Sequence, residues 1–301
     1  MTNLKEQTIG VEIEFTGTSR KKAAETVAKY FGTAATHNGG VYDSWAVKDN
    51  TGREWKILSD SSLKAEKKIG GEIRIADSQY RCELVTPILR WSDIETLQEI
   101  VRKIRKSGGF VNETCGLHVH IGAADISAQA VRNLINTVAS REELFYKALN
   151  VHENRKRYCK PTDKNFLRDL NAKKPATLEE VKEIWYKGED HTNFHYHSSR
   201  YTICNLHALF SKGTIEFRIF NGTLHAGEIK TAMQFSAALV AFAKKAKRAI
   251  YRPINLENEK FAMRTFLTRP TGLNLNSEEF ATLRFHLTKH LEGNAAWRYA
   301  C

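Results

Sequence analysis

Charged side chains inside short apolar segments are the feature that most constrains the fold of this 301-residue chain. Residues 10–15 read G-V-E-I-E-F, residues 116–122 read G-L-H-V-H-I-G, and residues 214–221 read T-I-E-F-R-I-F-N. Alternate residues of a β-strand project from the same face. Each segment therefore predicts a strand with one largely apolar face and one face that carries a polar pair: Glu12 with Glu14, His118 with His120, and Glu216 with Arg218.

Clustered acidic groups in apolar strands point to a bound cation. Burying an uncompensated carboxylate costs several kcal/mol, and neighbouring carboxylates repel one another. Glu83, in C-E-L-V-T-P, lies on a further predicted strand. Oxygen-rich ligation without thiolates favours Mg²⁺ or Mn²⁺ over zinc. Such ions on a basic protein favour an anionic ligand, and a nucleoside triphosphate meets that need.

Each motif taken alone has an ordinary structural explanation. An E-x-E pair is usually the solvent face of an edge strand, and an E-x-R pair is usually a surface ion pair. An H-x-H pair is slightly more often than not structural or part of a zinc site. Their occurrence together, in apolar strands, favours one shared site.

Composition sets wider limits on the class of protein. Hydrophobic residues make up 42% and charged residues 27%, which excludes a mainly disordered chain. The net charge of +12 attracts phosphates of any kind, although basic clusters on helices are usually solvated faces. We expect no membrane span and no signal peptide. The five cysteines are scattered, so reduced thiols and a cytoplasmic location are expected.

The spacing of apolar residues predicts an α+β fold with a largely antiparallel sheet. Predicted hairpins join 71–76 with 80–86 and 200–209 with 213–220. Predicted helices cover 19–31 with Ser19 as N-cap and Gly32 as stop, 92–107 with a Ser92/Glu95 capping box, 127–149 and 227–250. We expect a catalytic domain over 1–250 with a polar helical insertion or lid at 150–198. A helical extension over 251–301 would pack on the same domain.

Six motifs in order resemble the amidoligase family, which is grouped with glutamate–cysteine ligase and glutamine synthetase. They are G-V-E-I-E-F, L-S-D-S-S-L, E-L-V-T-P-I-L, C-G-L-H-V-H-I, R-Y-T-I-C-N-L and T-I-E-F-R-I-F-N-G-T-L, between about Gly10 and Phe235. The resemblance implies a glutamine synthetase-like catalytic fold, a curved antiparallel sheet with helices on its back. It also implies an ATP-dependent carboxylate–amine ligase that forms an amide or isopeptide bond through an acyl phosphate.

The resemblance further implies roles for single residues. One metal would be bound by Glu12, His118 and Glu216, and another by Glu14 and Glu83, with two or three Mg²⁺ or Mn²⁺ ions in all. Arg218 resembles the arginine that neutralises the transferring phosphoryl group, and His120 is implied to contact nucleotide or orient substrate. Positions on the substrate side match Asp60, Arg200 and Asn205. Glu72 is a further candidate ligand, with a hairpin charge as the alternative.

Several alternatives stay open. The substrates are a carboxylic acid and an amine, each an amino acid, peptide, cell-wall fragment or polyamine. A guanidino-kinase-type phosphotransferase on the same scaffold is a second reading, and a non-catalytic nucleic-acid binder a third. A zinc hydrolase built on His118 and His120 lacks the H-E-x-x-H motif. We do not expect a membrane or nucleic-acid partner. We expect Glu12→Gln or Glu216→Gln to abolish activity and leave the fold intact.

A histidine cluster is the rival metal site. His191, His195 and His197, in H-T-N-F-H-Y-H, could hold zinc together with His207. We favour a polar loop whose histidines bind substrate or water. The general base for the amine is not identified by the sequence. A loop carboxylate or one of these histidines could serve.

Overall fold

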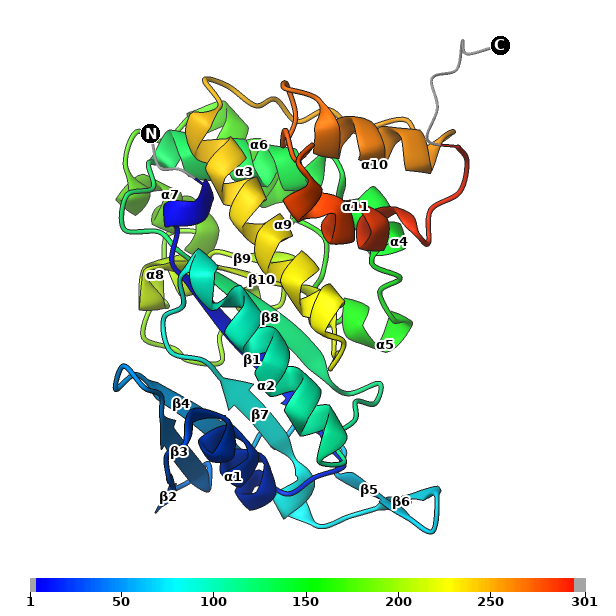
Figure 1. Cartoon of the computed structure of the whole chain (residues 1–301). Coiled ribbons are helices and arrows are strands. Elements are labelled where there is room, and N and C mark those ends of the chain that lie inside the picture. The colour runs from blue at the N-terminus through cyan, green and yellow to red at the C-terminus, as the bar shows by residue number, and fades with distance from the viewer. Residues whose placement is uncertain (1–3, 295–301) are drawn as a thin grey trace. The chain divides into compact units, whose positions relative to one another are not determined.

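The computed structural model of the chain describes residues 4–294, which divide into two compact units. The N-terminal unit comprises Thr8–Val119 and Phe220–Met233, and the helical unit comprises residues 4–7, 120–219 and 234–294. Strands and helices mix within both units, so the predicted α+β class is confirmed (Figure 1). Three elements run from one unit into the other: β8 (Gly116–Gly122), β10 (Thr214–Asn221) and α9 (Ala226–Lys245).

The N-terminal unit is built on an antiparallel sheet. Its strands follow the spatial order β2-β3-β4-β7-β1, and the first part of β8 lies beside β1. The pairings of β1 with β7, of β7 with β4 and of β4 with β3 are all antiparallel, as the sequence predicted. Bounds of the strands are β1 (Ile9–Phe15), β2 (Ala35–Gly39), β3 (Ser44–Lys48), β4 (Glu54–Leu58), β5 (Glu66–Ile69), β6 (Glu72–Ile75) and β7 (Cys82–Val85).

Two helices cover one face of these strands (Figure 1). Helix α1 (Arg20–Phe31) begins at Ser19, whose side chain accepts from the Lys22 backbone N–H, and it ends at Gly32 in the left-handed conformation. Helix α2 (Ile94–Lys106) buries its apolar stripe, including Leu97, Val101 and Ile104. Helix α1 therefore begins and ends at the residues that the sequence predicted, and α2 buries the predicted apolar stripe.

The helical unit surrounds a small sheet with helices. Strand β10 lies between the end of β8 and the two-residue strand β9 (Cys204–Asn205). Residues 150–198 contain three α-helices joined by loops, and residues 251–294 contain two α-helices, which confirms the predicted helical C-terminal part. The helices are α3 (Ala128–Ala139), α4 (Glu142–Ala148), α5 (Glu153–Lys156), α6 (Lys164–Lys173), α7 (Leu178–Tyr186), α8 (His207–Lys212), α10 (Glu259–Thr268) and α11 (Ala281–Thr288).

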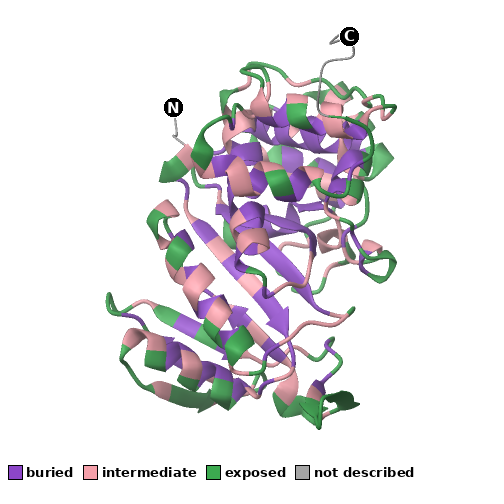
Figure 2. Ribbon diagram, turned by 45° about the vertical axis from the view of Figure 1, so that its right-hand side comes forward, coloured by how far each residue is buried: buried purple, intermediate pink, exposed green. Residues whose placement is uncertain are grey.

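The predicted hairpin between 71–76 and 80–86 is wrong. Strand β6 pairs with β5 across Gly70 and Gly71, both in the left-handed region, whereas β7 pairs with β1 and β4. The turn signal at Asp77 is real, but it caps a short 3-10 helix (Ser78–Tyr80) that leads the chain into the sheet. The apolar Cys82 and Leu84 are fully buried there, while all of β6 is exposed (Figure 2). Burial of apolar side chains therefore decided the pairing.

Two helix boundaries also differ from prediction. The helix expected over 127–149 is divided between α3 and α4, because Ser140 bonds to a distant loop. Its hydroxyl accepts from the Arg252 backbone N–H at 2.9 Å, and its carbonyl accepts from the Ile254 N–H at 3.2 Å. The Ser92/Glu95 capping box is replaced by Asp93, which accepts from the Arg90 N–H at 2.7 Å.

Two smaller predictions concern the membrane and the thiols. Within residues 4–294, no helix combines the length and the apolar character that a membrane crossing needs. Cys82, Cys115, Cys159 and Cys204 are buried and free of disulfides, while Cys301 lies outside the described residues.

Candidate functional site

Strand β1, which lies between β7 and the first part of β8, presents two carboxylates. Val11, Ile13 and Phe15 are at most 1% exposed, and Glu12 and Glu14 alternate with them. Glu14 is itself only 5% exposed, and it accepts a hydrogen bond from the Gly116 backbone N–H at 2.5 Å. The backbone N–H of Gly116 therefore holds this nearly buried carboxylate in place.

The strand register brings a third carboxylate to the same place. Glu83 of β7 lies directly opposite Glu14 in the pairing of β1 with β7, and opposite Leu58 of β4. Asp60 follows β4 by two residues and reaches the same group. Ligand oxygens of Glu14, Asp60 and Glu83 all lie within 4.8 Å of one another.

A second group shares Glu83 with the first. The His118 Nδ1 atom of β8 lies 3.2 Å from the Glu12 Oε2 atom. Ligand atoms of Glu12, Glu83 and His118 all fall within 4.8 Å of one another, and His118 is only 3% exposed. Glu83 thus joins two adjacent groups, which is how a bridging carboxylate serves a pair of metal ions.

The donors in these two groups fit a hard divalent cation. Four carboxylates and one imidazole, with no thiolate, are the ligand chemistry of Mg²⁺ and Mn²⁺. Carboxylates this close would otherwise repel each other in a partly buried setting. Glu72, the extra ligand candidate, is exposed on β6 and pairs with Arg74 at 3.0 Å, so it lies in a hairpin ion pair instead.

The helical unit holds the other predicted residues around a buried ion pair. Glu216 and Arg218 of β10 are 3% and 5% exposed and contact each other as carboxylate and guanidinium. Asn205 of β9 lies opposite Glu216 in the register and donates to its Oε2 atom at 2.6 Å. The His120 Nδ1 atom lies 2.9 Å from the Thr214 hydroxyl, and His120 Nε2 lies 3.9 Å from Glu216.

A small pocket of about 230 Å³ opens beside this ion pair. It contains Arg200 and Asn205, the two residues of this unit that the sequence placed near the substrate, together with Glu216. The lining of the pocket therefore includes a cation, an amide and a carboxylate. Its complete lining is Thr192, Asn193, His195, Arg200, Asn205, His207, Ala208, Ser211, Lys212 and Glu216.

Histidines of the 191–197 segment stack near the same pocket. The His191 and His197 rings lie 4.4 Å apart between centroids, and burial together with His191 lowers the pKa of His197. His207 hydrogen-bonds through Nδ1 to the Tyr186 hydroxyl at 2.5 Å. Burial, followed by the nearby His197 and Arg200 charges, lowers the pKa of His207 to about 4. His207 is therefore neutral at neutral pH.

The zinc alternative finds no support in this arrangement. Over residues 4–294, the groups of at least three ligand atoms close enough to hold an ion do not include His191, His195, His197 or His207. The Nδ1 atom of His207 is bonded to the Tyr186 hydroxyl, and the His207 ring stacks on the His197 ring at 6.0 Å between centroids.

Sequence reasoning placed the polar pairs on strands but did not foresee every member of the two acidic groups. A carboxylate oxygen of Asp60, which was expected on the substrate side, lies within 4.8 Å of carboxylate oxygens of Glu14 and Glu83. The pairing of His207 with Tyr186 was not foreseen, and no local pattern links residues 21 positions apart. The predicted set of Glu12, His118 and Glu216 draws on both units and stays a prediction.

Comparisons with known proteins add a family. A family model described as "Putative amidoligase enzyme" matches residues 5–240. No curated protein matches the chain. Among solved structures, a bifunctional glutathione synthetase from Pasteurella multocida is similar, with a TM-score of 0.43 and 11% identity. The match covers 95% of this chain and 47% of that one, so the chain spans about half the length of that enzyme.

Proposed function

The chain belongs to the putative amidoligase family, and we propose that it is an ATP-dependent carboxylate–amine ligase. In this proposal the γ-phosphoryl group of ATP passes to a substrate carboxylate, and an acyl phosphate and ADP form. An amine then attacks the acyl carbon, the C–N bond forms, and phosphate leaves with the bonding electron pair. A base takes the proton that the amine gives up.

The observation that carries the proposal is the pair of acidic groups that meet at Glu83. Oxygen-rich donors within 4.8 Å of one another suit Mg²⁺ or Mn²⁺. Bound there, such ions would neutralise the phosphates of ATP and align the γ-phosphoryl group. The chain's part is to hold the ligands in place: β1, β7 and β8 fix Glu12, Glu83 and His118, and the Gly116 N–H fixes Glu14.

The helical unit supplies the candidate groups that would stabilise negative charge on the oxygens of the substrate and of the phosphoryl group. We propose that Arg218 stabilises the transferring phosphoryl group and that His120 assists in nucleotide or substrate binding. The Glu216 carboxylate contacts the Arg218 guanidinium and orients it. Asn205 donates to the Glu216 carboxylate and so holds it in place. Arg200 lines the small pocket and is the candidate partner of the carboxylic acid substrate.

One histidine is the candidate base for the amine. His195 lines the small pocket with Arg200, whereas His191 and His197 stack on each other outside its lining. An imidazole at this wall could accept a proton from an amine near neutral pH. Amino acids, peptides, cell-wall fragments and polyamines all offer such an amine.

The test is trapping of the acyl phosphate. The full chain is incubated with ATP, Mg²⁺ and pooled carboxylic acids in the presence of hydroxylamine, and hydroxamate and ADP are measured. Hydroxamate formed in step with ADP supports a ligase, and Glu12→Gln should remove both products. The matched control Glu72→Gln, an exposed carboxylate in the same unit, should leave them unchanged.

Two outcomes would contradict the proposal. Phosphorylation of a guanidino acceptor without hydroxamate would instead assign a guanidino-kinase-type phosphotransferase. Full activity of Glu12→Gln would show that the acidic group containing Glu12 is not needed for the reaction.

A further inference from the structure

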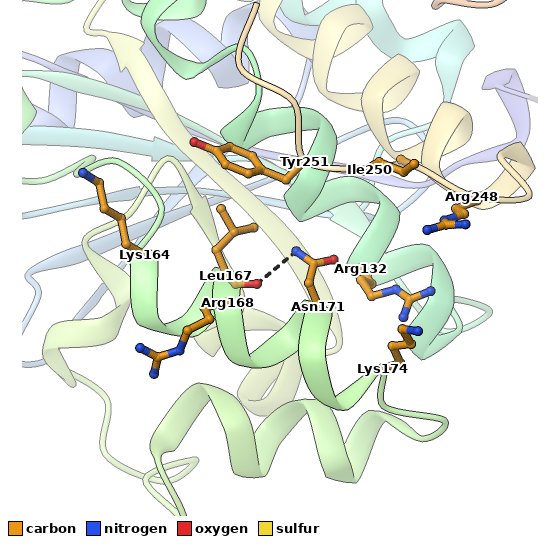
Figure 3. Close-up of a pocket in the computed structure, with 10 residues that line it drawn as sticks. Arg132, Lys164, Leu167, Arg168, Asn171, Lys174, Arg248, Ile250 and Tyr251 are labelled. Atoms are coloured by element: carbon orange, nitrogen blue, oxygen red, sulfur yellow. Dashed lines mark hydrogen bonds between the residues drawn. The ribbon is translucent and has the colours of Figure 1, made fainter.

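A second, strongly basic cavity lies within the helical unit. Its volume is about 840 Å³, within the usual range for small-molecule sites. It shares no lining residue with the small pocket beside Glu216. The cavity is lined by Arg132, Lys164, Leu167, Arg168, Asn171, Lys174, Arg248, Ala249, Ile250 and Tyr251 (Figure 3).

The lining carries positive charge without internal compensation. Five of its residues are arginine or lysine, and none is acidic. Arg168 is paired with Asp169 at 2.8 Å. Within residues 4–294 the other four cations, Arg132, Lys164, Lys174 and Arg248, make no ion pair. Figure 3 draws Arg132, Lys174 and Arg248 toward one end of the cavity and Lys164 and Arg168 toward the other.

Buried amides fix one wall of this cavity in place. Asn133 of α3 donates to the Ala246 carbonyl at 2.7 Å and accepts from the Ala249 N–H at 2.9 Å, which holds the segment on either side of Arg248. Asn133 is fully buried. The cations of this wall are therefore placed on a backbone that needs little ordering when a ligand binds.

A second buried amide joins that wall to the opposite one. Asn136 of α3 donates to the Ala249 carbonyl at 3.0 Å and exchanges two hydrogen bonds with Asn171 of α6, at 2.8 and 2.7 Å. Helix α6 also carries Lys164 and Arg168. One amide network thus connects the elements that present the cations.

We propose that this cavity binds a small ligand with two or more phosphate groups. Arginine and lysine together are the side chains that bind phosphate oxygens, and several are needed for a polyanion. Ile250 and Tyr251 are 64% and 42% exposed at the cavity wall and offer an apolar and aromatic surface for the rest of such a ligand. The volume of about 840 Å³ suits a compact ligand better than the extended backbone of a nucleic acid.

Binding here is independent of divalent ions. The lining contains no carboxylate that could hold a cation, so its own ammonium and guanidinium groups neutralise the phosphates. The ligase site proposed above depends on Glu12, Glu14 and Glu83 and therefore on Mg²⁺. Binding in a chelator that substitutions in this cavity weaken therefore reports on this cavity, whether or not the ligase proposal holds.

The matched test uses two lysines that end helices in the same way. Lys174 ends α6 and Lys187 ends α7, both in the left-handed conformation with φ of 49° and 58°. Glycine suits this conformation, so Lys174→Gly and Lys187→Gly each remove one charge and relieve the same backbone strain. Lys187 does not line the cavity and serves as the control.

Calorimetric titration of the full chain in EDTA with inorganic triphosphate and with ADP measures binding. We expect Lys174→Gly to weaken it several-fold and Arg132→Gln/Arg248→Gln to weaken it about tenfold or more. Lys187→Gly should bind as the wild type does, and affinity should fall steeply with salt. Tighter binding of triphosphate supports an inorganic polyphosphate ligand, and tighter binding of ADP supports a nucleotide.

Three results would overturn the proposal. One is equal loss of affinity in the Lys174 and Lys187 variants. Another is binding that requires Mg²⁺. The third is binding of a single-stranded oligonucleotide without binding of either small polyphosphate, which would assign the charge to a nucleic-acid surface.

Discussion

Glu14 and Glu83 lie directly opposite each other in the antiparallel pairing of β1 with β7. Like charges at such a pair of positions destabilise a sheet by ~0.2–1 kcal/mol. Glu14 is nearly buried, which adds to the cost. A divalent cation that binds both carboxylates would remove this repulsion and stabilise the sheet.

Neutralising Glu83 should therefore have opposite effects with and without metal. In EDTA, Glu83→Gln is expected to raise the free energy of unfolding by up to ~1 kcal/mol, because the cross-strand repulsion is lost. In saturating Mn²⁺ the wild type should gain ~2 kcal/mol or more and the variant much less. Urea unfolding in both solutions measures the difference. Glu72→Gln, which changes the same charge in an exposed hairpin, is the control. Equal stabilisation by Mn²⁺ in wild type and Glu83→Gln would contradict a metal site here.

The buried pair of Glu216 and Arg218 changes what is expected of a substitution at Glu216. Removing one partner of a buried ion pair typically costs 3–5 kcal/mol, because the other charge loses its compensation. Glu216→Gln should lower the free energy of unfolding by about that amount, rather than leave the fold intact as the sequence suggested. The double variant Glu216→Gln/Arg218→Gln should recover part of the loss. Urea unfolding of the wild type, the two single variants Glu216→Gln and Arg218→Gln, and the double variant tests this. Strictly additive losses of unfolding free energy would show that the pair is not coupled.

Loss of activity in Glu216→Gln could consequently come either from loss of a group that takes part in the reaction or from unfolding of the protein. Glu12 is the better test of the site, because its side chain is 19% exposed and is less deeply buried than Glu216. We expect the free energy of unfolding of Glu12→Gln to lie within ~1 kcal/mol of the wild-type value, while hydroxamate formation is lost. Thermal melting of the same samples is the check.

Two glycines with nearly the same backbone angle should differ in their tolerance of alanine. Gly17 has φ of 85° and Gly52 has φ of 83°. A Cβ atom at Gly17 would lie 2.3 Å from Phe110 Cδ1 and 2.5 Å from the Gly108 carbonyl, whereas one at Gly52 meets nothing within 4 Å. Gly52→Ala should cost ~1–2 kcal/mol for the left-handed conformation alone. Gly17→Ala should cost ~1–3 kcal/mol more. Similar unfolding free energies for the two variants would show that the backbone near Gly17 gives way.

His207 should make stability depend on pH in a defined window. Its pKa in the folded protein is about 4, below the ordinary value of 6.5, so the unfolded chain binds the proton more tightly. Stability therefore falls as pH drops from about 6.5 towards 4, by an amount on the order of 2–3 kcal/mol. Replacing the imidazole in His207→Gln should flatten this part of the profile. Unfolding free energies of both proteins are compared at pH 4.5, 5.5, 6.5 and 7.5. The same dependence on pH in the wild type and in His207→Gln would contradict a lowered pKa of His207.

Local patterns in the chain were sufficient for many elements of the fold. The alternation of Val11, Ile13 and Phe15 with two glutamates marked β1, and Ser19 and Gly32 marked the two ends of α1. These signals succeed because they depend on residues within one or two turns or pleats of each other. The order of polar pairs along the chain also identified the family that the comparison confirms.

Strand partners and the grouping of side chains were beyond such patterns. Asp77 signalled a turn correctly, yet β7 pairs with β1 and β4 because its Cys82 and Leu84 need burial that β6 does not offer. Asp60 reaches Glu14 and Glu83 only because β4 and β7 are adjacent with Leu58 opposite Glu83. Register between distant segments depends on the burial of whole faces, which no short window contains.

The chain by itself determined which residues alternate on each strand, where the capped helices begin and end, and that acidic and imidazole groups would share strand faces. Only the tertiary structure decided that Glu83 belongs to both acidic groups, and that cations from α3, α6 and the segment after α9 line one cavity. The physical reason is that local conformation follows from steric and hydrogen-bonding preferences of neighbouring residues. A site follows from the packing of segments far apart in sequence, where burial of apolar area outweighs local preference.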